Sequence, residues 1–555
     1  MISSAAADGE EKTLPNDNLD TTNTAETSLV LSTELLQKCR HLLEELDTFQ
    51  SLLHKKLRNP QVVEARQLRS NVASELRALE KLNRQAEDAV KSASTSTSTT
   101  ATTAAAGPAP DQDLAESRLI HALRSSNLPF YEAVWAVAKR SCTGLVAFGK
   151  RFYWDDEDGS GGVTDDGVKG KSKPSKDKRK SVFVDIIADD GEEWVKVSTI
   201  SESRLLFEMA EKGWEMDDSD LSSGDEDGQE RTILRNDWNS EEQDDENEIE
   251  LIKLARDAKK AASATRVRYR HPRVRFVLPK IEEGKFGDID SVLSEIRSHG
   301  ITVECRESEK DTSTVPKLLV SKDEPALSHL LPHPFIRFTS TLNVDCTLLL
   351  ALVSDLSHSQ SISPLPTHHK AIVRQIEIER EQPLLPAELW PAMSGHDLVC
   401  TEEAAKRMCE IVSIIGTDTE KMRTRILMGD SPFESETREA TLERFQELSD
   451  YQVPAQWRIP ITVVDAKTII DTARKHAKLP SVVQNAAEIL SDINYSVFLY
   501  GWITGLTTIT SNRTVAKQIE ATVESHRNGD DSLEGPPVWV CDTARSLIGK
   551  EKDRK

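Results

Sequence analysis

Apolar residues recur every three or four positions over residues 28–90, and the dipeptide Asn59-Pro60 interrupts this period in its middle. A period of this kind places apolar side chains along one face of a helix, and a proline ends a helix. The pattern therefore predicts a hairpin of two antiparallel helices. A coiled coil with a partner chain is the alternative, but the segment contains few clean heptads, which favours packing within the chain.

Polar stretches without such a period separate or precede the patterned regions of the chain. Residues 1–27 are polar and acidic, residues 91–112 are rich in Ser, Thr, Ala and Pro, and residues 311–332 connect two patterned regions. Segments of this composition bury too little apolar surface to fold by themselves. We therefore expect disorder over 1–27 and linkers over 91–112 and 311–332.

Residues 113–310 predict a mixed α+β module. A helical period over 113–141 leads into strand patterns at 144–154, 181–187 and 194–200, and Asp189-Asp190-Gly191 joins the last two as a hairpin turn. A short helix is expected at 204–212, and a strand–helix–strand unit runs from Arg273 to Cys305. The polar segments 155–180 and 215–250 are expected to be disordered loops.

Residues 333–555 alternate between strand and helix patterns, which is typical of a parallel α/β sheet with flanking helices. The predicted strands cover 342–345, 372–378, 397–400, 460–464, 506–510 and 537–540. The predicted helices cover 347–356, 402–415, 436–448, 466–476, 482–501 and 514–525. Ligands of such sheets bind at the edge where the strands end, so residues that follow a strand are the first candidates for a site.

Acidic and small polar residues gather near these predicted strand ends. They are Asp345 and Thr347 after the first strand, Glu402, Glu403 and Glu410 on the helix 402–415, Asp492 on the helix 482–501, and Thr510 and Asn512 near the strand end at 510. Carboxylate oxygens are the ligands that Mg²⁺ and Mn²⁺ prefer, and two such ions can promote phosphodiester cleavage. In this hypothesis Asp345 and Asp492 are the principal metal ligands, and the three glutamates assist catalysis.

The spacing of these residues resembles that of a PIN-like domain, whose first strand ends in Asp with a small polar residue two positions later. Asp345 and Thr347 match that motif. The family also carries an acid on a helix 18–20 residues before a Thr-x-Asp strand end, which Asp492 and Thr510 match, although position 512 is Asn. Its second acid is expected near Arg407, close to the three glutamates. The resemblance implies a PIN-like fold and a metal-dependent ribonuclease acting on single-stranded RNA.

Structural roles are the alternative for the same residues. Asp345 can cap the helix that begins at Thr347, and Asn512 can cap the helix that begins at Thr514. Asp492 is expected inside a helix, where no cap is required. Because Asn512 replaces the last acid of the motif, an inactive PIN-like scaffold, or an adaptor that binds protein or RNA, is the second hypothesis.

Taken as a whole, the chain resembles an uncharacterised eukaryotic family. In that family a helical and mixed N-terminal half precedes a PIN-like C-terminal domain, the domain of unknown function 1308. This second resemblance implies an arrangement of domains and no activity.

Five arginines alternate with other residues ahead of and within the predicted strand 273–278: Arg266, Arg268, Arg270, Arg273 and Arg275. Alternate positions on a strand share a face, so the stripe would present guanidinium groups to RNA phosphates, with Tyr269 for base stacking. The alternative is a half-buried strand whose arginines pair with the acidic segment 215–250. If the stripe binds RNA, alanine at 268, 270 and 273 should weaken binding, and deletion of residues 216–249 should strengthen it.

The net charge of −23 is spread unevenly along the chain. Residues 215–250 contain 16 acids and two arginines, a balance of −14. The remainder is only mildly acidic, so the total charge does not exclude nucleic acid as a partner. Within the acidic segment, Ser222 and Ser223 suit an acid-directed kinase. This segment and the N-terminal helices are the candidate surfaces for an unknown protein partner, and the basic run 169–180 is a second candidate for phosphate contact or nuclear import.

Seven cysteines show no CxxC spacing and no paired framework, which argues against a zinc module and indicates a reducing compartment. Residues 1–20 do not resemble a secretory or mitochondrial signal. No apolar run approaches the roughly 20 residues of a membrane helix. We therefore expect a cytoplasmic or nuclear protein without a membrane partner.

Overall fold

The computed structural model describes residues 24–57, 60–97, 110–155, 179–212, 248–306, 327–366, 368–476, 480–541 and 546–548. The chain divides into two compact units, residues 1–48 with 66–132 and residues 49–65 with 133–555. The disorder expected over 1–27, 155–180 and 215–250 concerns residues that lie largely outside the described ranges, as do the basic run 169–180 and the kinase sites Ser222 and Ser223.

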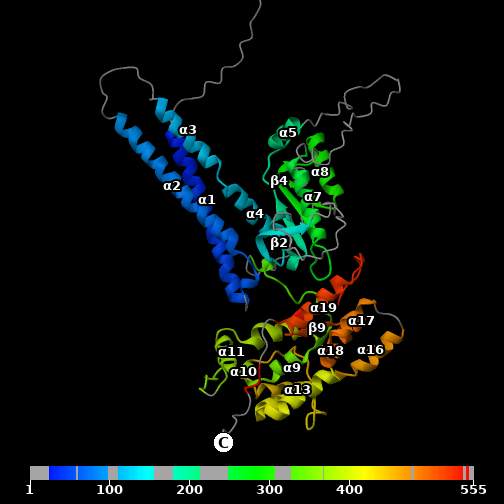
Figure 1. Ribbon diagram of the computed structural model, residues 1–555. Helices are drawn as coiled ribbons and strands as arrows, with labels where there is room; N and C mark the ends of the chain where they lie inside the picture. Colours follow the sequence, from blue (N-terminus) through cyan, green and yellow to red (C-terminus); the bar gives the residue numbers. More distant parts are fainter. Residues whose placement is uncertain are drawn as a thin grey trace, which may run out of the picture. The chain divides into compact units, whose positions relative to one another are not determined.

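The first unit is helical. Its helices are α1 (Thr24–Lys56), which extends into the second unit, α2 (Arg66–Thr97) and α3 (Pro110–Arg124). Helices α1 and α2 run antiparallel, because Ser32 donates a hydrogen bond to Asn83 at 2.8 Å while Asp47, further along α1, pairs with Arg69 at 2.5 Å (Figure 1). Helix α3 belongs to this unit, whereas the sequence pattern assigned its residues to the α+β module. Helix α2 also extends beyond residue 91, into the expected linker.

The second unit contains a mixed five-stranded sheet in the order β1-β2-β3-β4-β5. Its strands are β1 (Ala147–Asp155), β2 (Arg179–Ala188), β3 (Glu193–Val197), β4 (Arg273–Glu282) and β5 (Thr302–Arg306). The pairs β1–β2 and β2–β3 are antiparallel, and β3–β4 and β4–β5 are parallel. The helices of this part of the chain are α4 (Leu128–Ser141), α5 (Glu202–Glu211), α7 (Glu250–Ser263) and α8 (Gly287–Ser298).

Helix α7 was not predicted from the sequence pattern. Its buried face consists largely of Ala255, Ala258, Ala261 and Ala262, which share a core with strand residues such as Phe276. Leu251, Ile252 and these alanines recur at helical spacing, so the segment carries the period of an amphipathic helix, and alanine is the best helix former. The prediction left this segment, between the acidic residues and Arg273, unassigned.

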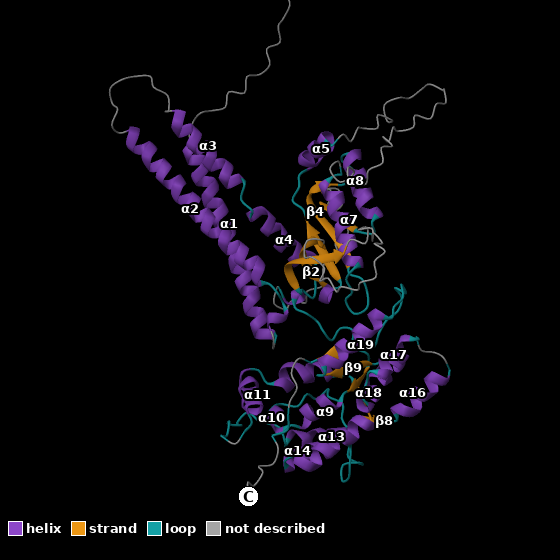
Figure 2. Cartoon of the chain, in the orientation of Figure 1, coloured by secondary structure: helices purple, strands orange, loops and turns teal. Residues whose placement is uncertain are grey.

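The second sheet of this unit is entirely parallel and has the order β10-β9-β6-β7-β8. Its strands are β6 (Thr341–Val344), β7 (Asp397–Thr401), β8 (Thr462–Val464), β9 (Thr507–Thr510) and β10 (Val538–Val540). The α/β class predicted for the C-terminal region is therefore confirmed, and Figure 2 shows the strands with helices packed around them.

Helices connect these strands along the chain. They are α9 (Cys346–Val353), α10 (Asp355–His358), α11 (Lys370–Glu381), α12 (Trp390–Met393), α13 (Glu402–Ile415), α14 (Asp418–Met428), α15 (Arg438–Gln446), α16 (Ala466–Lys475), α17 (Val482–Glu488), α18 (Asp492–Thr504) and α19 (Arg513–Ser525). A π-helical turn at Leu385–Leu389 precedes α12, and 3₁₀ turns lie at Pro60–Val62, Asp189–Gly191 and Ser328–Leu330. Among the described residues no helix combines the length and hydrophobicity needed to cross a membrane.

Several elements of this region differ from the sequence prediction, and helices α12 and α14 were not predicted. The segment 372–378, predicted as a strand, lies within helix α11, because its β-branched residues imitate a strand while Ile376 and Glu379 are buried at helical spacing. The single helix predicted over 482–501 is two helices, α17 and α18, which are separated by residues 489–491. Asp492 is therefore the first residue of a helix and does not lie in mid-helix.

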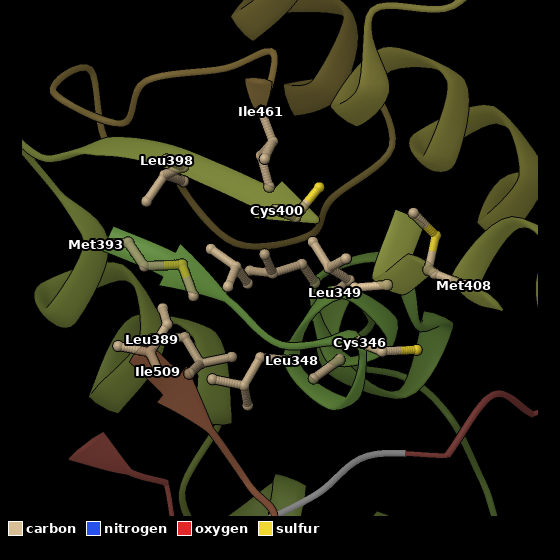
Figure 3. Close-up of a cluster of buried hydrophobic side chains, with 14 of the residues drawn as sticks. Cys346, Leu348, Leu349, Leu389, Met393, Leu398, Cys400, Met408, Ile461 and Ile509 are labelled. Atoms are coloured by element: carbon tan, nitrogen blue, oxygen red, sulfur yellow. The ribbon is translucent and has the colours of Figure 1, made fainter. Parts of the chain in front are cut away.

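Apolar side chains of α9, β7 and β9 form the centre of the core around the parallel sheet. Figure 3 shows Leu349 of α9 toward Cys400 on β7 and Leu348 toward Ile509 on β9, the strands on either side of β6. Burial of this cluster holds the strand ends in a fixed arrangement, since protein cores are closely packed.

Helix α18 approaches the sheet closely at Gly501. A Cβ atom at this position would lie 2.0 Å from the Thr508 hydroxyl oxygen on β9. The Asn343 side chain of β6 donates to the Val497 carbonyl at 2.8 Å and to the Thr508 hydroxyl at 3.0 Å. These contacts therefore hold helix α18 against strands β6 and β9, next to the candidate site.

Candidate functional site

The strand order places two of the predicted residues at the point where the sheet changes its winding direction. From β6 the chain proceeds to β7 and β8 on one side of the sheet, and later to β9 and β10 on the other. Asp345 follows β6, and Thr510 ends β9. The crevice between the carboxyl ends of two such strands is where open α/β sheets bind ligands.

The Asp345 carboxylate is buried at this point and is held by two hydroxyl groups. Its side chain is 2 % exposed. The hydroxyls of Thr510 and Thr347 both donate to its Oδ2 atom, at 2.6 Å and 2.7 Å. Burial raises the pKa of Asp345, while the hydrogen bonds from Thr510 and Thr347 act in the opposite direction. Asp345 also occupies the N-cap position of α9, and the backbone amides of Cys346 and Thr347 beside its carboxylate lower its pKa as well.

The backbone after β9 supports both threonines. The amide of Asn512 donates to the Thr510 hydroxyl at 2.9 Å, and the amide of Ser511 donates to the Thr347 hydroxyl at 3.1 Å. The Asn512 side chain turns to the next helix and accepts from the Val515 amide at 3.3 Å, as the N-cap of α19. The structure thus gives Asn512 the capping role.

Asp492 and the glutamates lie at the same edge of the sheet, on the side of β7 and β8 and not on the side of β9. The Ser496 hydroxyl on α18 lies 3.1 Å from the Thr401 hydroxyl at the end of β7, which holds the first turn of α18 beside that strand end. Asp492 begins this turn and is exposed, and Glu402 is exposed as well. Glu410 lies further along α13 and pairs with Arg407 at 3.4 Å.

Lys467, which the sequence analysis did not single out, contacts this group. Its ammonium group lies 3.1 Å from the Glu403 carboxylate. The pKa of Lys467 is raised, chiefly by Glu403 and to a lesser extent by Asp492 and Asp465. Asp465 follows β8 and caps α16 through the Thr468 amide. The sequence signal for Lys467 and Asp465 was their position directly after the predicted strand 460–464.

These side chains do not form a metal centre as they stand. Within the described part of the chain, no three His, Cys, Asp or Glu residues come together in a way that could hold a metal ion. Asp345 accepts hydrogen bonds from two threonines, and Glu403 is paired with Lys467. The acids fall into two groups, Asp345 at the switch point and Glu403 with Asp492 near Lys467. The two-ion chemistry expected from the sequence stays a prediction.

Each of the five arginines has an acidic partner in the structure. Arg266 pairs with Glu524 and Asp531, Arg268 with Asp190 and Glu192, Arg270 with Glu534, Arg273 with Asp189, and Arg275 with Glu193 and Glu304. Only Arg273 and Arg275 belong to β4, and residues 266–270 form a turn. These partners lie outside the segment 215–250, which the sequence had suggested and most of which lies outside the described residues.

Comparison with known proteins gives a family match within the C-terminal region. A family described as "Protein of unknown function (DUF1308)" matches residues 342–444. The match runs from β6 into α15 and includes Asp345 and Glu403, but it ends before Asp492 and Thr510. No curated protein and no solved structure gives a match to the chain.

Proposed function

We propose that the C-terminal region is a PIN-like domain that has no metal-dependent nuclease activity and serves as a scaffold for binding other molecules. The observation that carries this proposal is the position of the Asp345 carboxylate, which is 2 % exposed and accepts hydrogen bonds from Thr347 and Thr510. Two-metal hydrolysis requires carboxylates that contact ions held between enzyme and substrate, and Asp345 is buried.

Two further contacts support the same conclusion. Asn512 stands where the motif expects its last acid, and its side chain caps α19. The Glu403 carboxylate is already neutralised by the Lys467 ammonium group at 3.1 Å. A cation supplied by the protein itself removes much of the electrostatic attraction that an acidic site offers to a divalent ion.

A PIN-like ribonuclease acting on single-stranded RNA is the second candidate function. The observation in its favour is that Asp345 and Thr510 lie at the topological switch point, the usual ligand position in such sheets. In this case Asp345 and Asp492 would hold Mg²⁺ or Mn²⁺, with Glu402, Glu403 or Glu410 assisting. Glu403 would first have to give up its contact with Lys467, whereas the threonine hydrogen bonds to one oxygen of Asp345 are compatible with metal binding by that carboxylate.

Two further expectations follow from the scaffold function. The expected partners are RNA, or a protein bound through the N-terminal helices or the acidic segment 215–250. The expected location is the cytoplasm or the nucleus. A pull-down that loses its partner when residues 28–90 or 215–250 are removed would support the protein-binding form of the proposal.

A cleavage assay distinguishes the two candidate functions. The purified full chain is incubated with labelled single-stranded RNA and Mn²⁺, next to Asp345→Asn, Asp492→Asn and the control Asp471→Asn, an exposed acid on α16. We expect all four proteins to show the same residual cleavage. Mn²⁺-dependent cleavage by the wild type and the control that is lost in both Asp345→Asn and Asp492→Asn would overturn the scaffold proposal. Asp492 is exposed, so its variant remains informative if the substitution at the buried Asp345 disturbs folding.

A further inference from the structure

Residues 266–270 form a tight turn with an unusual backbone. Val267 and Arg270 exchange two backbone hydrogen bonds of 2.8 Å and 3.1 Å. The two central residues, Arg268 and Tyr269, have φ angles of 51° and 71°. Positive φ is unfavourable for residues with a side chain, so surrounding contacts must hold this arginine turn, defined as residues 266–270, in place.

Most contacts that hold the arginine turn come from the end of α19 and the segment after it, while Arg268 pairs with Asp190 and Glu192. Arg266 pairs with Glu524 at 3.2 Å and with Asp531 at 2.5 Å, and Arg270 pairs with Glu534 at 2.6 Å. The Tyr269 ring lies against Gly535, where a Cβ atom would come within 2.2 Å of the ring. We refer to residues 524–535 as the C-terminal acidic loop.

The C-terminal acidic loop is itself well ordered around one arginine. Arg527 is 6 % exposed and donates to the carbonyls of Asp530 and Leu533 at 2.8 Å and 2.7 Å. It also donates to the Tyr269 carbonyl at 3.3 Å. The hydrogen bonds of Arg527 therefore fix the backbone conformation from which the loop presents its acids to the arginine turn.

We infer that the C-terminal acidic loop is an intramolecular competitor that occupies the arginine turn and limits its binding to the phosphates of single-stranded RNA. Arg270 and its partner Glu534 have side chains that are 60 % and 52 % exposed, and Asp531 is 72 % exposed. Ion pairs between exposed side chains contribute little to stability. The Arg270–Glu534 pair is therefore the contact that a polyanion displaces most easily, whereas the side chain of Arg266 is only 17 % exposed and is held more firmly.

Nucleic acid suits this exchange better than an acidic protein does. An acidic peptide offers the same carboxylates as the resident loop, which has the advantage of being in the same chain. An RNA backbone offers phosphates that arginine binds in bidentate fashion, and it releases condensed counterions on binding. This inference does not depend on whether the sheet edge is catalytic.

A binding experiment with matched charge changes tests the inference. The full chain, Asp531→Asn/Glu534→Gln and the control Glu439→Gln/Glu443→Gln are titrated into a fluorescein-labelled 20-nucleotide RNA without secondary structure, over a range of salt concentrations. The control acids are exposed on α15, and both variants change the net charge by +2. We expect the loop variant to bind about fivefold more tightly, with a salt slope steeper by about 1.4 for two additional phosphate contacts to single-stranded RNA.

Two additional variants keep the result interpretable. Adding Arg266→Ala and Arg270→Ala to the loop variant should return the affinity to the wild-type value or below it. Asp531→Lys alone should strengthen binding in the same direction, and thermal melting verifies that each variant is folded. An equal gain in the loop variant and the control would show a bulk charge effect and overturn the inference. Polyglutamate that competes as well as unlabelled RNA would assign the turn to an acidic protein and also overturn it.

Discussion

The Thr510 hydroxyl donates a 2.6 Å hydrogen bond to the carboxylate of Asp345, although the two residues are 165 positions apart in the chain. The bond joins the ends of β9 and β6, the two strands between which the sheet changes its winding direction. It is made in a buried environment, where a carboxylate is costly unless hydrogen-bonded. One contact thus stabilises the sheet edge and engages the acid that a metal site would require.

Thr510→Val should destabilise the domain by about 1–3 kcal/mol, since it removes a hydrogen bond to a buried charged group. The loss should be larger at pH 8 than at low pH. Burial raises the pKa of Asp345 and the Thr510 hydrogen bond lowers it, so removal of the hydroxyl raises this pKa further. The penalty is therefore fully present where Asp345 is ionised and shrinks as pH falls and the carboxyl becomes protonated. Urea unfolding at several pH values measures it.

The control for this prediction is Thr522→Val. The Thr522 hydroxyl is exposed on α19 and donates only to the Gln518 carbonyl among the bonds that the structure shows, at 2.8 Å. Its replacement should change the free energy of unfolding by less than about 0.5 kcal/mol at every pH. A pH-independent loss in Thr510→Val would contradict the role assigned to the Asp345 charge.

Gly501→Ala should destabilise the domain by about 1–3 kcal/mol, the usual cost of overpacking. The new methyl group would meet the Thr508 hydroxyl at 2.0 Å, which outweighs the better helix propensity of alanine. Gly287→Ala on α8 is the control, because no atom lies within 4 Å of its Cβ position. In a double-mutant cycle with Thr508→Ala, the combined loss should be smaller than the sum of the two single losses. Additive losses would show that the close approach is not the cause.

His358 should contribute to acid unfolding. It is completely buried, and burial together with the nearby Arg423 charge lowers its pKa to about 3. The folded state then binds fewer protons than the unfolded state, whose histidine titrates near 6.5. Stability is present above pH 6.5 and is lost as pH falls below it, by up to about 1.4 kcal/mol per pH unit from this residue.

His358→Gln should therefore flatten the dependence of stability on pH between about 3 and 6.5, while losing some stability at pH 7 through the ring contacts with Phe445 and Trp390. The exposed residue His476 provides the control variant His476→Gln. If both variants retain the wild-type slope below pH 6.5, His358 does not drive acid unfolding.

Lys467→Met should increase the response to Mn²⁺. The wild type should show no Mn²⁺-dependent shift in Tm, because Lys467 already neutralises Glu403. Removal of the ammonium group leaves Glu403 and Asp492 without their shared cation, and binding of an ion to the native state raises Tm. Lys475→Met at the end of α16 is the control for charge, and Glu403→Gln in the Lys467→Met background should abolish the gain. A Mn²⁺ shift of the same size in wild type and Lys467→Met would contradict the proposed role of the lysine.

Local sequence patterns determined most of the secondary structure of the parallel sheet and the candidates at its edge. The strand patterns before Asp345 and around Thr510 correspond to β6 and β9, because alternation and apolar runs reflect short-range burial. The same local signal failed at residues 372–378, where β-branched residues belong to helix α11. Helix α7 was also not predicted, although its buried residues recur at helical spacing.

The partners of these residues were decided by the tertiary structure alone. The sequence placed an acid at 345 but could not show that Thr510 would bind it, and it placed five arginines without the acids at 524–534 that pair with two of them. Contacts of this kind depend on which strands become neighbours and on where the loops after them lie. Strand order and loop placement follow from the packing of the whole core, and no local period along the chain encodes them.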